Sequence, residues 1–524
     1  MKWPMPSGWQ FIIYGSFVVA LVCIVHSIDE IRFESVFKLD KIPLFLPETF
    51  HHSINETILG NTPPNSTIFL ATTTTDIPKK PQQKIQFPLN CTFGIHRTCP
   101  ANYYPTSFPS QDDQDSPSTT TTCPDYFRWI YEDLRLWKEI GITREMVEER
   151  ARVESNFRLV ILNGRAYIER YRKGFETRDL FTQWGILQLL RRYPGKLPDL
   201  DLVFSVSDRP VIKSTDYSTG PNATAPPPLF RYCGTDDTLS IVFPDWSFWG
   251  WAEVNIKPWE RILEELKKGD KRWKDKEAYA YWKGTPLSRN RRDLLKCNIS
   301  DKQHWGARLY LLDWKKERQE GFKQSNLASQ CMHRYKIYLE GFGWSVSEKY
   351  ILACNSITLL VKPRYYDFFT RGLMPMNHYW PIKEYDQCRS IKFAVEWGNN
   401  HEQEAQDIVK AASDFIHEDL KMDYVYDYMF HVLREYAKLL RYKPTIPERA
   451  FEICSETLAC PAVGLHKTFM MESMVKGPID VSPCNMPPPY DPHAFRMLLR
   501  SKANSVSLVE LWEQRYWENQ AKHN

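Results

Sequence analysis

Asp208 is the first residue whose type and setting could carry chemistry. It follows a nearly continuous apolar run in LDLVFSVSDRP (200–210), which predicts a short buried strand that Arg209 and Pro210 turn into a loop. In open α/β sheets, ligands bind beyond the carboxyl ends of the strands. A carboxylate there can accept a proton from a substrate hydroxyl, a contribution of about 10²–10⁴ in rate. The alternative is that Asp208 only caps the turn before the proline.

A second candidate is the basic segment YWKGTPLSRNRRDLL (281–295). A predicted strand ends at Gly284 and Thr285, and Arg289, Arg291 and Arg292 then enter a helix. Glycine allows close backbone approach, and hydroxyl and guanidinium groups donate hydrogen bonds to phosphate oxygens. The pattern therefore suits a diphosphate, with a solvated basic turn as the alternative.

A third candidate is the glycine- and serine-containing loop EGFGWSVSEKY (340–350), which runs into a predicted helix with Lys349 on its first turn. Helix N-termini attract anions, so this loop predicts a further anion contact. Neither this loop nor the basic segment has the Walker or Rossmann pattern. GWSVS also differs from the G-x-S-x-G nucleophile elbow, because Ser347 replaces the last glycine.

Aromatic residues form a fourth cluster in FPDWSFWGWAEVNIKPW (243–259). Aromatic faces are common floors for sugar rings or bases. Phe243 and Phe248 are expected in the core. Tryptophan carries an N–H group that needs a partner, which favours the edge of a cleft. We therefore expect an acceptor cleft lined by three residues: Trp246, Trp249 and Trp251.

A metal site is not expected. The DLD sequence at 199–201 resembles the DxD motif of metal-dependent transferases, but it lies at the start of the strand that leads to Asp208 rather than at a strand's end. It is interpreted as a strand-entry turn. Cys91 and Cys99, and likewise Cys454 and Cys460, are too isolated from histidine or further cysteine pairs to indicate zinc.

The elements that must position these residues alternate between strands and helices. FRLVILNGRAYIERY (157–171) predicts a hairpin around Asn163-Gly164. The remaining expected elements are a helix over 177–195, strand or helix segments at 239–245, 259–269, 276–284, 333–341, 347–355 and 357–363, and long helices over 401–420 and 423–444. This alternation predicts an α/β fold with parallel sheets.

The N-terminal part predicts a membrane anchor and a stem. Residues 11–28 (FIIYGSFVVALVCIVHSI) contain no Asp, Glu, Lys or Arg, with Lys2 before them and Asp29 and Glu30 after. This favours an uncleaved anchor with the rest of the chain in the lumen, and a cleaved signal peptide is the alternative. Residues 29–122, with ATTTTD and PSQDDQDSPSTTTT, predict a disordered stem. LNCTFGIHRTCP (89–100) is expected to form a small island held by Cys91 and Cys99.

Composition supports a luminal protein. The chain has 524 residues and a net charge of +4 with no long basic block, which argues against nucleic-acid binding. Eleven of its 12 cysteines follow the predicted anchor, as expected in an oxidising compartment, and the odd number leaves one thiol free or paired between chains. Five sequons predict N-glycosylation at Asn55, Asn65, Asn90, Asn222 and Asn298.

Taken in order, these clusters resemble glycosyltransferase family 90, which contains the Rumi-type protein O-glucosyltransferases and the fungal capsule xylosyltransferases. The resemblance extends from about Cys123 to Pro444. It rests on SVSDRP, FPDWSFWGW, YWKGT followed by RRD, the spacing of Cys331 and Cys354, and HEDLKMDYVYDYMFHVLREYAKL.

The resemblance implies a GT-B architecture, in which the active site lies between two Rossmann-like domains. It implies inverting transfer from a UDP-sugar without a required metal, with Asp208 as the catalytic base, and a disulfide between Cys331 and Cys354. The donor-binding residues that it implies are Ala252, Glu253, Val254, Asn255, Ile256, Lys257, Pro258, Gly284, Thr285, Arg292, Phe342, Gly343, Trp344, Ser345, Val346 and Ser347.

Two positions depart from the family pattern. Lys257 stands where the Rumi-type enzymes have a tyrosine, and Ser347 stands where they have an arginine. Lys349 is expected to supply the missing charge at the donor. The chain ends in AKHN instead of an ER-retrieval signal, and its anchor and stem are similar to those of Golgi type II glycosyltransferases, so a Golgi membrane is expected rather than the ER.

The expected layout is a cytosolic tail (1–10), an anchor (11–28), a stem (29–122), an acceptor-side half (123–258), a donor-side half (259–444) and a cysteine-containing extension (445–524). The expected function is transfer of glucose or xylose from UDP-glucose or UDP-xylose to a glycan or protein hydroxyl. One alternative is a luminal carbohydrate-binding or scaffold protein without turnover. A glycoside hydrolase, which would need two carboxylates across one sugar, ranks last because only Asp208 stands out.

Overall fold

The computed structural model describes residues 87–92, 98–100, 121–150, 152–217, 225–269, 271–301, 303–479 and 481–523. The predicted anchor at 11–28 and most of the predicted stem lie outside these residues. Among the residues that are described, no helix has both the length and the apolar character needed to cross a membrane.

The first of two sheets is mixed. Its strands are β1 (Phe157–Leu162), β2 (Arg165–Arg170), β3 (Leu200–Phe204), β4 (Leu229–Arg231), β5 (Ile241–Val242) and β11 (Phe451–Ile453), in the order β11-β2-β1-β3-β4-β5. The predicted hairpin is confirmed: Asn163 and Gly164 have φ angles of 51° and 73°, as a two-residue turn requires. β3, β4 and β5 are parallel, whereas the other neighbours are antiparallel.

The second sheet is entirely parallel. It consists of β6 (Glu277–Gly284), β7 (Ala307–Leu311), β8 (His333–Tyr338), β9 (Ile357–Val361) and β10 (Trp380–Ile382), in the order β10-β9-β8-β6-β7. β9 is buried along its whole length, which matches its unbroken apolar sequence ITLLV. The expectation of parallel sheets therefore holds for this sheet and is wrong for three of the five strand pairs of the first. One of these three pairs is β1 with β2, because a two-residue turn can join only antiparallel strands.

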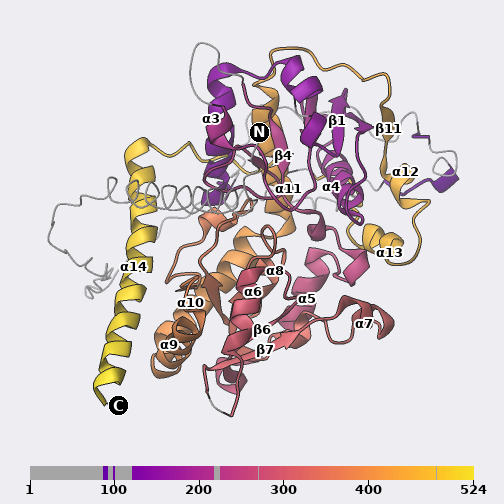
Figure 1. The fold of residues 1–524 in the computed structure, drawn as a ribbon. Coiled ribbons are helices and arrows are strands. Elements are labelled where there is room, and N and C mark those ends of the chain that lie inside the picture. Colours follow the sequence, from indigo (N-terminus) through magenta and orange to yellow (C-terminus); the bar gives the residue numbers. More distant parts are fainter. Residues whose placement is uncertain are drawn as a thin grey trace, which may run out of the picture. The chain divides into compact units, whose positions relative to one another are not determined.

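Helices pack around both sheets (Figure 1). α3, α4 and α11 lie with the first sheet, and α9 packs on β6, β9 and β10 of the second. Each sheet has its own hydrophobic core, and the core of the first sheet also takes in α5, α8 and α11. The helices are α3 (Trp129–Ile140), α4 (Arg178–Arg192), α5 (Trp259–Gly269), α6 (Arg289–Leu294), α7 (Trp314–Gln319), α8 (Ser347–Leu352), α9 (Gln387–Asn400), α10 (Glu402–Asp414), α11 (Met422–Ala437), α12 (Ser455–Ala459), α13 (Gly464–Glu472) and α14 (Pro492–His523).

The residues after 445 are integrated into the fold. β11 extends the first sheet beyond β2, and α12 packs on α4. α14 runs along the second half and packs on α9 (Figure 1), where Glu513 accepts a hydrogen bond of 2.7 Å from Ser390. The C-terminal segment thus contacts both halves of the chain.

Disulfides fasten the start of the described chain to its end. Cys331 and Cys354 are bonded, as the resemblance implied. The expected island is wrong in its bonding, because Cys91 pairs with Cys460 and Cys99 with Cys454 instead of with each other. The other two disulfides are Cys123–Cys484 and Cys297–Cys388, and Cys233 is the free cysteine among the described residues.

This bonding pattern can be checked by mapping peptides from the non-reduced protein. We expect peptides that link Cys91 to Cys460 and Cys99 to Cys454. Removing the first pair as a Cys91→Ser/Cys460→Ser double variant should lower the free energy of unfolding by about 2–5 kcal/mol, because the unfolded chain gains freedom. A peptide that links Cys91 to Cys99 would contradict the assignment.

Candidate active site

Asp208 lies beyond the carboxyl end of β3, as predicted. The loop that carries it is fixed at its start, because the Ser205 amide donates to the Phe230 carbonyl (3.0 Å) and the Val206 amide donates to the Asn156 side chain (2.9 Å). The carboxylate of Asp208 remains 43% exposed. Asp208 therefore follows a backbone held by hydrogen bonds and presents an accessible carboxylate.

Arg178 holds this carboxylate. The guanidinium is buried and donates to Asp208 Oδ1 at 2.5 Å and to the Val206 carbonyl at 3.3 Å. It also lies over two aromatic rings, with its Cζ 4.5 Å from the ring centroid of Trp246 and 5.0 Å from that of Phe175. Sequence reasoning missed Arg178. The available signal was an arginine in the first turn of a helix, where the helix dipole disfavours a cation.

We expect Arg178→Met to lower kcat about 10- to 100-fold, because the Asp208 carboxylate, the predicted base, would lose the position from which it can reach an acceptor hydroxyl. Arg192→Met is the matched control. Arg192 lies at the other end of α4, about 21 Å along the helix axis, and also pairs with an aspartate at 2.5 Å, Asp423. Steady-state kinetics of both variants test this role. Equal losses in the two variants would contradict it.

A loop from the second sheet touches the Asp208 backbone. Residues 339–347 follow β8, and the Phe342 carbonyl accepts a 2.8 Å hydrogen bond from Arg209 Nε. A Cβ atom at Gly343 would fall 2.1 Å from the Asp208 carbonyl oxygen, so this contact requires glycine. The structure thus brings together Asp208 and the predicted loop 342–347 from two different sheets.

The end of β6 joins the same region through Arg291. Its guanidinium donates to the carbonyls of Thr285 (3.3 Å), Leu339 (3.1 Å) and Glu340 (3.0 Å). Burial lowers the pKa of Arg291. Arg292, the arginine expected at the diphosphate, has an exposed side chain that donates to two nearby carbonyls at 3.2 and 3.4 Å. The sequence placed Arg291 in the predicted basic segment but did not show that it links the ends of β6 and β8.

The predicted donor segment 252–258 alternates between buried and accessible side chains. Ala252, Val254, Ile256 and Pro258 are buried. Glu253, Asn255 and Lys257 are half-buried, and Glu253 accepts a hydrogen bond of 2.9 Å from Thr177, the residue before Arg178. Lys257 forms an ion pair with Glu265. The segment therefore reaches the Asp208 region through Glu253.

Lys349 does not take the place expected for it. Its ammonium is buried and bonded to the buried Asp245 carboxylate at 2.9 Å. Burial alone would lower the pKa of Lys349, but Asp245, together with Tyr350 and Asp367, more than offsets this effect and raises it. Ser347 interacts with Ser345 at 2.9 Å, and Trp344 is buried. The expected replacement of the missing arginine by Lys349 is therefore not supported.

Two of the three tryptophans expected at a cleft edge belong to the core. Trp246 and Trp249 are buried, and the indole N–H of Trp249 donates to the Tyr426 hydroxyl at 3.0 Å. An internal partner thus satisfies the indole N–H of Trp249, whereas that of Trp246 is buried without a hydrogen-bond partner among the described residues. Trp251 is half-buried and donates to Glu176 at 2.6 Å, whose pKa is raised by burial. Phe243 and Phe248 are core residues, as predicted.

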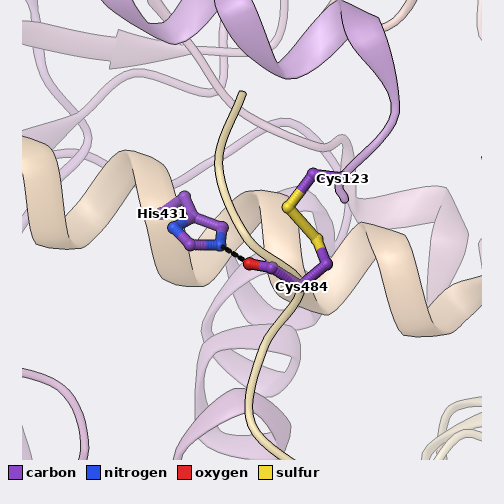
Figure 2. A group of neighbouring side chains, drawn as sticks. All are labelled: Cys123, His431 and Cys484. Carbon is purple, nitrogen blue, oxygen red and sulfur yellow. Dashed lines mark hydrogen bonds between the residues drawn. A yellow bond between two sulfur atoms is a disulfide. The ribbon is translucent and has the colours of Figure 1, made fainter. Parts of the chain in front are cut away.

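Two residue groups with metal-ligand side chains serve the fold instead. Asp201 of the DLD sequence is buried and bonded to Arg158 at 2.6 Å, and Asp199 accepts a hydrogen bond of 2.7 Å from the Asn163 amide in the hairpin turn. Figure 2 shows Cys123, Cys484 and His431 close together. The two sulfur atoms form a disulfide, and His431 Nε2 donates to the Cys484 carbonyl at 2.8 Å. These sulfurs are therefore not thiolate ligands.

Two of the five predicted glycosylation sites lie within the described residues. Asn90 is exposed. Asn298 is half-buried, and its side-chain amide both donates to and accepts from the Leu309 backbone, at 3.0 and 2.9 Å. A glycan on Asn298 would disturb these bonds. The sites at Asn55, Asn65 and Asn222 lie outside the described residues.

Comparison with known proteins gives a family match. The sequence model of Glycosyl transferase family 90 matches residues 118–513, so the match continues well past Pro444, where the resemblance was expected to end. O-glucosyltransferase rumi of Drosophila melanogaster is 26% identical over 361 residues, which cover 66% of this chain and 82% of that protein. Protein O-glucosyltransferase 1 of Homo sapiens is 27% identical over 349 residues, which cover 63% of this chain and 84% of that protein.

Proposed function

This chain belongs to glycosyl transferase family 90, and on that premise we propose that it is an inverting transferase that moves glucose or xylose from a UDP-sugar to a hydroxyl of a glycan or protein. One observation carries the proposal: Asp208 is bonded to Arg178, and its backbone carbonyl packs against Gly343 of the predicted donor loop 342–347. The names of the relatives, which describe O-glucosyltransferases, make glucose the first donor to test.

In the proposed reaction, the acceptor hydroxyl oxygen attacks the anomeric carbon of the sugar and its proton passes to Asp208. The bond between that carbon and the UDP oxygen breaks on the opposite face, so the configuration inverts. UDP leaves with the bonding electron pair. Arg292 is the accessible cation proposed to stabilise the diphosphate, and such stabilisation is commonly a large part of the rate enhancement.

A GT-B arrangement is proposed for the two sheets. Asp208 follows a strand of the first sheet, whereas Thr285 and residues 342–347 follow strands of the second. The contacts between Arg209 and Phe342 and between Gly343 and Asp208 support an active site where the carboxyl ends of these strands meet. Trp251 and Glu253 are proposed to face the substrates from the same side.

No resident metal is proposed for the reaction. The DLD carboxylates are occupied by Arg158 and by the Asn163 amide, and Arg292 provides a cation in place of a metal. The five disulfides of the described residues support an oxidising compartment, and we place the enzyme in the secretory pathway, at the Golgi membrane, anchored through residues 11–28.

Release of UDP by the full chain, purified in detergent, tests this function. The donors are UDP-glucose, UDP-xylose and other UDP-sugars, and the acceptors are cell-wall oligosaccharides and glycopeptides. Acceptor-stimulated release from one donor is expected, with an inverted anomeric configuration in the product. If no donor releases UDP and UDP itself does not bind, the enzyme is refuted and the alternative of a luminal carbohydrate-binding or scaffold protein is left.

A further inference from the structure

Glu340 joins the ends of two neighbouring strands in the second sheet. It lies two residues after the end of β8. Its carboxylate oxygen Oε1 accepts the backbone N–H groups of Arg364 (2.9 Å) and Tyr365 (2.7 Å), which follow β9. Hydrogen bonds to an ionised acceptor are about twice as strong as neutral ones. The side chain therefore clamps the chain leaving β8 to the chain leaving β9.

The backbone of Glu340 adds the end of a third strand. Its carbonyl accepts from Arg291, which also donates to the carbonyl of Thr285 at the end of β6. Hydrogen bonds to Glu340 thus connect the segments that follow β6, β8 and β9. The Glu340 side chain contacts the chain after β9 directly, and its carbonyl is linked to the end of β6 through Arg291.

The chain that leaves this junction leads directly to Asp208. Two and three residues later, the Phe342 carbonyl binds Arg209 and the Cα of Gly343 packs against the Asp208 carbonyl. Without the Glu340 carboxylate, this loop would lose its link to the chain after β9, while the backbone bonds to Arg291 and Arg209 would remain. The position of the loop relative to the UDP-sugar and to Asp208 would then vary.

We propose that Glu340 is a positioning residue whose carboxylate sets residues 341–347 in place for the donor diphosphate. This inference rests on the proposed function. Glu340 would act on the same site through the backbone of the loop, without touching the substrate. The carboxylate points to the 364–365 backbone, so its effect on the donor passes through the loop.

The test uses the full chain and compares Glu340→Ala with Glu340→Gln. The glutamine amide oxygen can accept both N–H groups, whereas alanine accepts neither. Glu340→Ala should raise the Kd for UDP and the KM for the UDP-sugar about tenfold, with the acceptor KM unchanged. Glu340→Gln should recover most of this loss. An unchanged Kd for UDP in Glu340→Ala would overturn the proposal.

Glu317→Ala is the matched control for a general loss of stability. Glu317 is buried, and its Oε2 likewise accepts two successive backbone N–H groups, from Gln324 (3.0 Å) and Ser325 (2.9 Å), in the loop after α7. It should lower Tm without raising the Kd for UDP. If Glu317→Ala raises that Kd as much as Glu340→Ala does, the effect of Glu340 is merely structural and the proposal fails.

A pH profile gives an independent readout. Burial raises the pKa of Glu340 to about 7, against the lowering effect of the two N–H groups. As pH falls through this value, the carboxylate is protonated and its hydrogen bonds weaken, so the donor KM of the native protein should rise more steeply than that of Glu340→Gln. The charged and titratable groups around this carboxylate are Arg364, Glu384, Glu348, Tyr338, Tyr365 and Arg291. Parallel profiles would count against the proposal.

The two proposals fail in different ways. If the native protein neither binds UDP nor turns over any UDP-sugar, the proposed function is wrong. If the native protein is active and Asp208→Asn is inactive, but Glu340→Ala binds UDP normally, only the role of Glu340 is wrong.

Discussion

Asp208→Asn should lower kcat by about 10²–10⁴, because asparagine cannot take the proton that leaves the attacking hydroxyl. Asparagine preserves the size of the side chain and can still accept from Arg178, so the loop should keep its position. We therefore expect the Kd for UDP and the Tm to stay near those of the native protein. Rapid-quench or steady-state measurement of sugar transfer gives kcat, and calorimetry gives the binding constant.

The control for this substitution is Asp216→Asn. Asp216 is an exposed aspartate in the short turn that follows the Asp208 loop, Ser214–Asp216, and we expect near-native kcat from it. If Asp208→Asn keeps more than half of the native kcat, another group must accept the proton. Glu176 would then be the next residue to test, because it is bonded to the half-buried Trp251 close to Arg178.

Local patterns in the sequence predicted most elements near the site. The hairpin at Asn163-Gly164 and the helix expected over 177–195, observed at Arg178–Arg192, were found because both depend on nearby residues: a turn pair with positive φ, and Pro194 and Gly195 at the helix end. The pairing of β11 with β2 was not predictable, since β11 is only three residues long and its partner lies far away in the sequence. The partners of Cys91 and Cys99 were not predicted for the same reason, because they lie 369 and 355 residues away in the sequence.

The candidate site shows the same division between local and long-range information. Asp208 could be placed at a strand end because the apolar run before it marks the strand. Arg178 and Arg291 could not be assigned, because each acts on groups that reach it only through the fold. Trp249 was wrongly expected at a cleft edge. The sequence shows that an indole N–H needs a hydrogen-bond partner, but it does not show that this partner is the Tyr426 hydroxyl in the core.

Lys349→Met should lower the free energy of unfolding by about 3–5 kcal/mol, because removing one member of a buried ion pair leaves the other charge uncompensated. The two side chains, Lys349 and Asp245, are only 1% and 2% exposed, so water cannot replace the lost ammonium. Denaturant unfolding followed by intrinsic fluorescence measures the change. Lys410→Met is the control, since Lys410 pairs with Asp414 on the exposed face of α10 and should contribute at most about 0.5 kcal/mol.

A double variant separates this structural role from a role at the donor. Lys349→Met combined with Asp245→Asn should recover part of the lost stability, because the uncompensated charge is gone and the introduced amide oxygen can still accept the Ser247 amide hydrogen bond that Asp245 accepts at 2.8 Å. The Kd for UDP of the folded single variant should stay within about twofold of native, a change below about 0.5 kcal/mol. A stable Lys349→Met protein that has lost UDP affinity would instead place the ammonium at the diphosphate. That outcome would require Lys349 to leave Asp245 when the donor binds. The free energy gained from the phosphate oxygens would then have to exceed the cost of leaving the buried Asp245 carboxylate unpaired.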